Sequence, residues 1–260
     1  MQLIVVKIGG NVIDVPEKLD SFLKAFAGIE GYKILVHGGG KIASELGKKL
    51  GIEPNYVNGR RITDAPTLSL VTMVYGGLIN KNMVAALQAK GCNAIGLTGA
   101  DGGILPAEKR RVTDIDYGYV GDVKSENIGG ELVMKFLQSG LTPVFAPLTY
   151  DGNGGILNTN ADTIAQEIAK AMASHLPVQL IYCFEKRGVL IDAADDTSVI
   201  NSITREDFKE LKEKEIITGG MIPKLENAFE AISEGVESVI IGHADDLAEL
   251  ISGNTGTCIR

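Results

Sequence analysis

Residues 3–10 of the chain read Leu-Ile-Val-Val-Lys-Ile-Gly-Gly. This run is apolar and rich in β-branched residues, only Lys7 interrupts it, and two glycines end it. Continuous apolar runs of this length are typical of strands in a parallel sheet that is covered on both faces. Similar runs lie at residues 33–36, 94–97, 142–147, 178–183, 238–241 and 257–259. The sequence therefore predicts a central parallel sheet that begins with residues 3–8.

Amphipathic helical patterns separate these runs. Ile164, Ile168 and Met172 recur at intervals of four residues, and residues 222–232 repeat apolar side chains at helical spacing. This alternation predicts an α/β fold, a three-layer αβα sandwich around a central, mostly parallel open sheet. Short runs with turn residues at 105–123 predict β-hairpins beside that sheet.

The composition is that of an ordinary globular chain. Of 260 residues, 45% are hydrophobic and 22% are charged, and no Pro-, Gly- or Ser-rich linker divides them, so we expect one domain over residues 1–260. The net charge is −8, Trp is absent and aromatic residues make up 5%. Such a chain repels phosphate backbones and offers little for bases to stack on, which argues against nucleic-acid binding.

The cysteines and the N-terminal residues indicate a cytoplasmic protein. Cys92, Cys183 and Cys258 are far apart and lack metal-ligand spacing, so we interpret them as reduced thiols. Residues 1–10 have no basic start, and Lys7 interrupts the apolar run, so we expect neither a signal peptide nor a membrane span.

Two glycine-rich turns follow predicted strands, at Gly9–Gly10 and at Gly38–Gly40. Ligands of a parallel sheet bind beyond the carboxyl ends of its strands, and glycines let backbone N–H groups approach an anion there. The spacing matches neither the P-loop nor the dinucleotide fingerprint. The alternative is that the glycines only make tight turns. We expect His37, beside the second turn, to be structural.

Two lysines lie near such turns. Lys7 precedes the first turn by two residues, so its ammonium could reach the carboxyl edge of the sheet. Lys224 follows a glycine-bearing loop, and Pro223 suits the first turn of the helix that follows. Taken singly, Lys7 could also point outward from an edge strand, and Lys224 could be an exposed helix residue.

Taken together, six segments resemble the amino-acid kinase family, and within it the acylglutamate and related aminoadipate kinases. The segments occur in family order over almost the whole chain. They are residues 6–11 (Val-Lys-Ile-Gly-Gly-Asn), 36–40 (Val-His-Gly-Gly-Gly), 58–63 (Asn-Gly-Arg-Arg-Ile-Thr), 96–102 (Gly-Leu-Thr-Gly-Ala-Asp-Gly), 158–162 (Asn-Thr-Asn-Ala-Asp) and 218–224 (Thr-Gly-Gly-Met-Ile-Pro-Lys).

The resemblance implies transfer of a phosphoryl group from ATP to the γ-carboxylate of N-acetyl-L-glutamate, the second step of arginine biosynthesis. A carboxylate is already ionised at neutral pH, so the reaction needs charge neutralisation and alignment rather than a general base. By the resemblance, Lys7 and Lys224 stabilise the transferring group from opposite sides, and Asp162 orients both lysines. We expect Asn160 to cap the helix that carries Asp162.

The resemblance also assigns residues to the acylglutamate. It implies that Gly10, Gly39 and Gly40 contact the substrate or the transferring oxygens through their backbone. Arg61 would hold the α-carboxylate, since a guanidinium suits bidentate pairing, and Asn158 would contact the amino-acid end. Arg60 would only be solvated.

For ATP, the resemblance implies mainly a C-terminal lobe, residues 177–260, beside an acylglutamate and dimerisation lobe, residues 1–176. Residues 183–186, Cys-Phe-Glu-Lys, depart from the family's usual pattern in the loop that lines the nucleotide. We expect Mg²⁺ to be held mainly by the ATP phosphates, with no protein ligand. The candidate ATP-binding residues are Gly9, Glu185, Lys186, Gly188, Leu190, Ile216 and Thr218.

Several alternatives stay open. The acyl group could be succinyl, as in N-succinyl-L-glutamate, or the substrate an N-acyl-aminoadipate. A catalytically silent, amino-acid-binding regulatory module is possible on the same fold. Arginine-inhibited hexamers of the family carry a helix before the first strand. The first predicted strand of this sequence already begins at Leu3, so we expect a homodimer that arginine does not inhibit. Its surface would be the helix around 68–86, with Leu70, Val74 and Leu78 along one face, although core packing explains the same stripe.

Overall fold

An eight-stranded sheet runs through the centre of the chain. The structure is a computed structural model that describes residues 1–57, 59–192, 194–219 and 221–260, so the motif residues Asn58 and Gly220 lie outside the described residues. The strand order is β12-β14-β13-β11-β1-β2-β8-β5. The strands are β1 (Leu3–Ile8), β2 (Tyr32–His37), β5 (Ala94–Leu97), β8 (Thr142–Phe145), β11 (Val178–Phe184), β12 (Ser202–Ile203), β13 (Ser238–His243) and β14 (Thr257–Ile259).

The expected strands are confirmed, several of them to the residue. All neighbouring strands pair in parallel except β13 and β14, which are antiparallel, so the sheet is mostly parallel as predicted. The sequence analysis missed β12, because two residues are too few to show a pattern.

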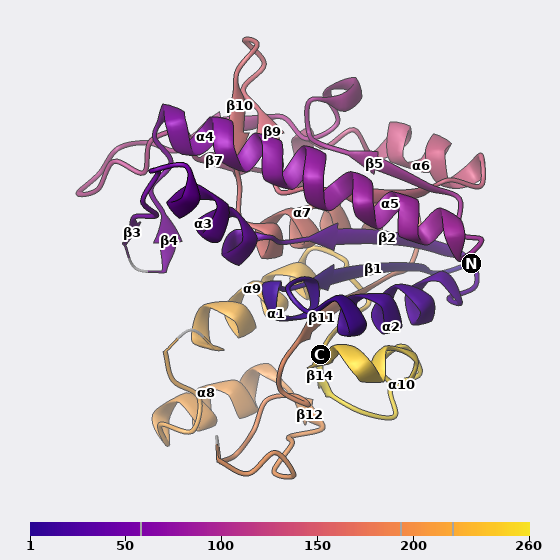
Figure 1. Cartoon of the computed structure of the whole chain (residues 1–260). Helices are drawn as coiled ribbons and strands as arrows, with labels where there is room; N and C mark the ends of the chain where they lie inside the picture. Colours follow the sequence, from indigo (N-terminus) through magenta and orange to yellow (C-terminus); the bar gives the residue numbers. More distant parts are fainter. Residues whose placement is uncertain (58, 193, 220) are drawn as a thin grey trace.

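Helices cover both faces, which confirms the three-layer sandwich (Figure 1). Helices on one face are α1 (Gly10–Ile13), α2 (Pro16–Ala27), α3 (Gly40–Lys49), α4 (Ala65–Val71), the π-helix η1 (Thr72–Ile79), α5 (Asn80–Ala89) and α10 (Leu247–Ile251). Helices on the other are α6 (Gly130–Gln138), α7 (Ala161–Ala173), α8 (Arg205–Glu213) and α9 (Met221–Ser233).

The alternation of side chains along β1 decides where Lys7 points. Leu3 and Val5 belong to the core beneath α7 and α9, whereas Ile4 and Val6 belong to the core beneath α2 and α5. Successive side chains of a strand point to opposite faces, so Lys7 shares the face of Leu3 and Val5. The first strand therefore directs this ammonium toward α7.

Short strands form additional antiparallel pairs beside the main sheet. The predicted hairpin region at 105–123 contains β6 (Ala107–Lys109) paired with β7 (Gly121–Val123), which confirms the prediction. The other pairs are β3 (Tyr56–Val57) with β4 (Arg60–Arg61), and β9 (Leu148–Tyr150) with β10 (Ile156–Asn158). Short 3₁₀ turns are η2 (Asp101–Gly103), η3 (Ser125–Asn127) and η4 (Ala244–Asp246).

The segment Ala65–Ala89 forms a long helix from α4, η1 and α5. By length and composition alone it could cross a membrane, but 44% of its most apolar window is buried inside the molecule. It also carries Asn80, a buried amide that donates to the Val144 carbonyl oxygen at 2.9 Å. A helix that packs in the core of a folded domain meets the same length and composition test.

The turn between β2 and α3 depends on a glycine. Gly39 has φ 154°, and a Cβ placed there would lie 2.3 Å from Ile79 Cδ1 and 3.1 Å from Tyr75 Cδ1. Both side chains belong to η1, so the absence of a side chain at Gly39 lets this helix pack directly on the turn. Glycine at position 39 therefore permits both the backbone conformation of the turn and the close packing of η1 on it.

We predict that Gly39→Ala lowers the free energy of unfolding by about 1–3 kcal/mol, because the added methyl group must displace Ile79 and strain the backbone. Urea unfolding of the two proteins measures this difference. Gly38→Ala is the matched control, since a Cβ there would lie at an ordinary 3.7 Å from the Ile8 carbonyl oxygen. Equal losses in the two variants would contradict the explanation.

Candidate active site

A cleft of about 470 Å³ opens beside the carboxyl ends of the strands. Its walls come from the β2–α3 turn, the β3–β4 hairpin, the β6–β7 region and the first turns of α7 and α9. Six predicted site residues line it together, although they are far apart in the sequence. They are Gly39, Gly40, Arg61, Asn158, Asp162 and Lys224.

Lys7 joins this group through an ion pair. Its Nζ lies 2.7 Å from Asp162 Oδ1, with 13% of the Lys7 side chain and 30% of the Asp162 side chain exposed. Asp162 lies in the first turn of α7, where the Asn160 side chain accepts the backbone N–H groups of Asp162 and Thr163. The predicted Asn160 cap is confirmed, and the positive end of the helix favours the ionised carboxylate.

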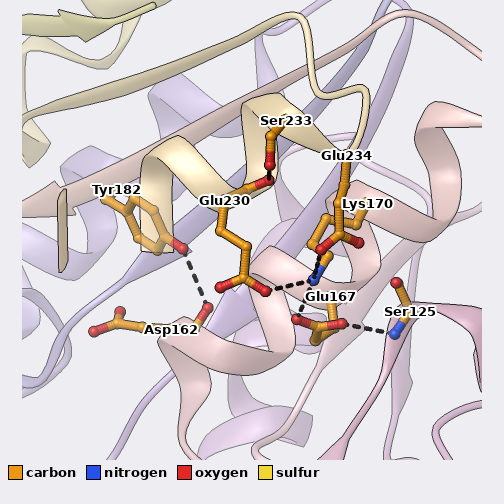
Figure 2. Close-up of polar contacts among 8 residues, drawn as sticks. All are labelled: Ser125, Asp162, Glu167, Lys170, Tyr182, Glu230, Ser233 and Glu234. Carbon is orange, nitrogen blue, oxygen red and sulfur yellow. Dashed lines mark hydrogen bonds and ion pairs between the residues drawn. The ribbon is translucent and has the colours of Figure 1, made fainter. Parts of the chain in front are cut away.

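The electrostatics of Asp162 are set by competing effects. Burial alone would raise its pKa, but the ammonium groups of Lys7 and Lys224 outweigh burial and hold the pKa below its ordinary value. Its backbone is also fixed, because the Tyr182 hydroxyl donates to the Asp162 carbonyl oxygen at 3.3 Å (Figure 2). The carboxylate is therefore ionised; Lys7 pairs with it directly, and the charge of Lys224 stabilises it further.

Lys224 rests on two aromatic rings. Its Nζ lies 4.8 Å from the ring centre of Phe184 and 5.9 Å from that of Tyr182. Burial lowers the pKa of Lys224, the Asp162 carboxylate raises it, and the Lys7 ammonium lowers it again, with a net decrease. Cation–π contact compensates in part for the lost water. Phe184 belongs to residues 183–186, which depart from the usual family pattern and were expected only to line the ATP site.

Arg61 is buried at the back of the cleft. Its Nη2 donates to the Gly40 carbonyl oxygen at 2.8 Å, to Ser44 Oγ at 2.7 Å and to the Tyr56 hydroxyl. The guanidinium also lies over the Tyr56 ring, at 4.7 Å from its centre. These contacts fix the guanidinium beside the Gly39–Gly40 turn. Arg60, expected only to be solvated, is exposed and also lines the cleft.

Asn158 connects two of the sequence motifs. Its Nδ2 donates to Thr63 Oγ1 at 3.0 Å, so the last residue of one motif contacts the first residue of another. The backbone N–H of Asn158 donates to the Tyr119 carbonyl oxygen at 2.9 Å, which holds it against the β6–β7 region. Asn158 thus has a fixed orientation in the wall of the cleft.

His37 supports the second glycine turn from inside. Its Nε2 accepts a hydrogen bond from Asn80 Nδ2 at 3.2 Å, which leaves Nδ1 to donate to the Gly38 carbonyl oxygen at 2.7 Å. Burial lowers the pKa of His37 to about 4, although the bond to Gly38 raises it slightly, so the ring is neutral at pH 7. The structural role expected for His37 agrees with this geometry.

The first glycine turn and the ATP candidates lie outside the walls of the cleft. A Cβ at Gly9 would lie 3.7 Å from Lys7 Nζ, and Gly10 begins α1, so this turn lies beside the ammonium. Lys186 pairs with Asp196 at 2.7 Å. The remaining ATP candidates follow β11 or precede α9, and none of them lines the cleft; they are Glu185, Gly188, Leu190, Ile216 and Thr218.

Several lining residues were missed by the sequence analysis. Arg110 reaches the cleft from the β6–β7 region while paired with Asp122, and Tyr75 reaches it from η1. Neither belongs to a motif, and only the fold brings them to the site. The other lining residues that were not predicted are Tyr56, Val120, Pro147, Thr163, Tyr182, Pro223 and Asn227. The site gathers ammonium and guanidinium groups around one carboxylate, a composition suited to multiply charged anions.

Known proteins of one family match almost the whole chain. The sequence profile of the amino acid kinase family matches residues 2–243. The chain is 57% identical to the acetylglutamate kinase of Cytophaga hutchinsonii over 254 residues, 97% of this chain and 96% of that relative. It is 56% identical to the acetylglutamate kinase of Phocaeicola vulgatus over 259 residues, 100% of this chain and 98% of that relative.

A solved structure extends the comparison to the fold. A protein of Streptococcus mutans UA159 superposes with a TM-score of 0.79 at 31% identity, and the match covers 99% of this chain and 98% of that one. From the family profile and from relatives that are more than half identical over nearly their full length, the chain belongs to the amino acid kinase family.

Proposed function

We propose that the chain transfers the γ-phosphoryl group of ATP to the γ-carboxylate of N-acetyl-L-glutamate, giving N-acetyl-L-glutamyl 5-phosphate in arginine biosynthesis. The observation that carries the proposal is the Asp162 carboxylate, which pairs with Lys7 at 2.7 Å and lines the same cleft as Lys224. It occurs in a chain more than half identical to acetylglutamate kinases over nearly its full length.

In this proposal the nucleophile is the ionised γ-carboxylate, so no side chain has to remove a proton. Attack of one carboxylate oxygen on the γ-phosphorus breaks the bond to the β-phosphate oxygen, and ADP leaves. Lys7 and Lys224 neutralise charge on the transferring group from two sides, and Asp162 keeps both ammonium groups aimed at it. The enzyme thus works by positioning and charge neutralisation.

Backbone and guanidinium groups hold the acylglutamate. We assign the α-carboxylate to Arg61, because its guanidinium lines the cleft beside the Gly39–Gly40 turn and carries five N–H donors in a fork that suits a carboxylate. Asn158 faces the amino-acid end of the substrate, and the amides of Gly10, Gly39 and Gly40 face the reacting oxygens. This arrangement aligns the γ-carboxylate of the substrate with the γ-phosphate of ATP, although the two anions repel each other.

For ATP, we assign the loops around Gly9, residues 185–190 and residues 216–218. In the described part of the chain, no three His, Cys, Asp or Glu side chains gather in a way that could hold a metal ion. We assign Mg²⁺ mainly to the ATP phosphates and water, as is usual for Mg²⁺ beside nucleotides, where it would neutralise phosphate charge. The assignment divides the chain into an acylglutamate lobe, residues 1–176, and an ATP lobe, residues 177–260.

We further propose a cytoplasmic homodimer that pairs through the long helix. The expected stripe needs correction, because Leu70 and Val74 are buried within the chain itself and cannot contact a partner. Leu78 is exposed by 47%, and Met73, one turn before the small residue Gly77, is exposed by 58%. These residues form an apolar face that a second copy of the chain would cover.

The proposed activity is tested by ADP release in the presence of ATP, Mg²⁺ and one acceptor at a time. The acceptors are N-acetylglutamate, N-succinylglutamate, glutamate and an N-acyl-aminoadipate. Turnover with N-acetylglutamate supports the proposal. Binding of N-acetylglutamate without transfer from ATP would favour the silent regulatory module instead.

One observation favours N-succinylglutamate as a second candidate substrate. The cleft is lined by Arg60 and Arg110 in addition to Arg61, and either guanidinium could pair with the additional carboxylate of a succinyl group. Two results together would identify succinyl as the acyl group. The KM for N-succinylglutamate would be lower than that for N-acetylglutamate, and Arg110→Met would raise the KM for N-succinylglutamate. An N-acyl-aminoadipate is longer by one methylene group and has no such support.

We predict that Lys224→Ala reduces kcat on the order of 10²–10³-fold and changes the KM for N-acetylglutamate less than about threefold, because the ammonium acts on charge that develops in the transition state. Steady-state kinetics with both substrates varied give these values. A kcat like that of the unaltered enzyme would refute the role assigned to Lys224.

We predict that Met73→Lys combined with Leu78→Lys converts the dimer to a monomer, because two charges at the centre of an apolar interface cannot be solvated there. Light scattering measures the mass. Val112→Lys is the control, since Val112 is 62% exposed but lies outside the helix. A mass of one chain for the unaltered protein, or an unchanged dimer for the double variant, would contradict the proposed interface.

A further inference from the structure

A buried cation that the proposed reaction does not use lies between α7 and α9. The Lys170 side chain is 5% exposed, and its Nζ lies 2.9 Å from Glu167, 3.2 Å from Glu230 and 2.9 Å from Glu234 (Figure 2). Lys170 and Glu167 belong to α7, whereas Glu230 belongs to α9 and Glu234 follows its last turn. The ammonium therefore connects one helix to the other.

The same two helices carry the catalytic candidates at their first turns. On α7, Asp162 precedes Lys170 by eight residues, about 12 Å along the axis, and on α9, Lys224 precedes Glu230 by six residues, about 9 Å. At one end, Asp162 of α7 and Lys224 of α9 line the same cleft on either side of Tyr182, whose hydroxyl donates to the Asp162 carbonyl oxygen and whose ring centre lies 5.9 Å from Lys224 Nζ. At the other end, a base of α7 pairs with acids of α9. A shift of α9 along α7 would break the Lys170 ion pairs and at the same time move Lys224 relative to Asp162.

The cluster also contacts the segment that follows β7. Glu167 Oε2 accepts the backbone N–H of Ser125 at 2.6 Å (Figure 2). Ser125 begins η3, two residues after the last residue of β7. One carboxylate thus ties the β6–β7 region to α7, and Lys170 ties α7 to α9.

Stability alone is a poor explanation for this cluster. Burying an ammonium costs free energy, and the attraction of its ionic partners often recovers no more than this cost. Apolar residues of similar volume commonly give the folded protein the same stability. Burial would lower the pKa of Lys170, but the carboxylates of Glu167, Glu234 and Glu230 raise it above its ordinary value, so the group is charged. What an ion cluster provides beyond apolar packing is a fixed register between two helices.

We propose that Lys170 is a positioning residue for phosphoryl transfer, which through Glu230 and Glu234 holds α9 in the register that keeps Lys224 beside Asp162. This inference rests on the proposed function, because it requires Lys224 to act on the transferring group. It assigns Lys170 no contact with either substrate.

The test is the double variant Glu230→Ala/Glu234→Ala. Both side chains are about half exposed, and alanine suits a helix, so the variant should fold, and the Lys170–Glu167 and Glu167–Ser125 contacts remain within its unaltered part. We expect kcat to fall about tenfold, because small displacements of a catalytic group cost this much. The KM for N-acetylglutamate should change less than twofold, since Arg61 and Asn158 lie on other elements.

Two comparisons separate positioning from stability and from a loss of charge. Glu226 is an exposed carboxylate of α9 that pairs with Lys212 of α8 at 3.2 Å, not with Lys170. Glu226→Ala therefore removes a charge even closer to Lys224 in sequence without altering the Lys170 cluster, and it should leave kcat unchanged. Lys170→Arg should preserve kcat, whereas Lys170→Met should lower it. A double variant with a lower Tm but an unaltered kcat at 25 °C, or an equal loss of kcat in Glu226→Ala, would overturn the inference.

The outcome for Lys224→Ala distinguishes the two proposals. If that variant retains normal kcat, the proposed role of Lys224 fails, whatever the α9 variants show. If Lys224→Ala loses activity while the double variant keeps it, only the positioning role of Lys170 fails.

Discussion

The ion pair between Lys7 and Asp162 is the contact on which the site depends. It joins the first strand to the first turn of α7, at 2.7 Å, in a position where little water competes. A buried carboxylate without a cation would take up a proton, and a buried ammonium without a carboxylate would lose one. The charges of Lys7 and of Lys224 from α9 hold the pKa of the Asp162 carboxyl below its ordinary value, so this carboxylate stays ionised.

The remaining features of the site protect this arrangement. The net charge of −8 gives no general attraction for anionic substrates, so local groups must supply it. Glycine turns bring backbone amides to the sheet edge, and Gly39 in addition lets η1 pack against the turn. Aromatic rings beneath Lys224 and the buried His37–Asn80 pair hold charged and polar groups in place without water.

Much of the fold and part of the site could be predicted from the sequence. Apolar runs such as residues 3–8 revealed the strands, because a strand buried on both faces needs no polar side chains. Lys7 was conspicuous because it interrupts such a run. Arg61, Asn158, Asp162 and Lys224 stood in motifs, and the fold brings all four to one cleft, where Asp162 pairs with Lys7.

What could not be predicted depends on contacts between distant segments. Periodicity identifies a buried helix face but does not say what covers it, so Leu70 and Val74 were assigned equally to a dimer surface and to the core. Phe184 belongs to an unusual segment, and only the packing of β11 and α9 reveals its contact with Lys224. Lys170 belongs to an ordinary helix, and only the packing of α7 and α9 reveals its contact with Glu230.

The most direct test of the account is a crystal structure of the protein with ADP, Mg²⁺, N-acetylglutamate and a planar fluoroaluminate in place of the transferring phosphoryl group. We expect the ammonium groups of Lys7 and Lys224 to contact the fluoroaluminate from opposite sides, with Asp162 between them. A fluoroaluminate bound away from both lysines, with Lys224 still on the Phe184 ring, would contradict the account.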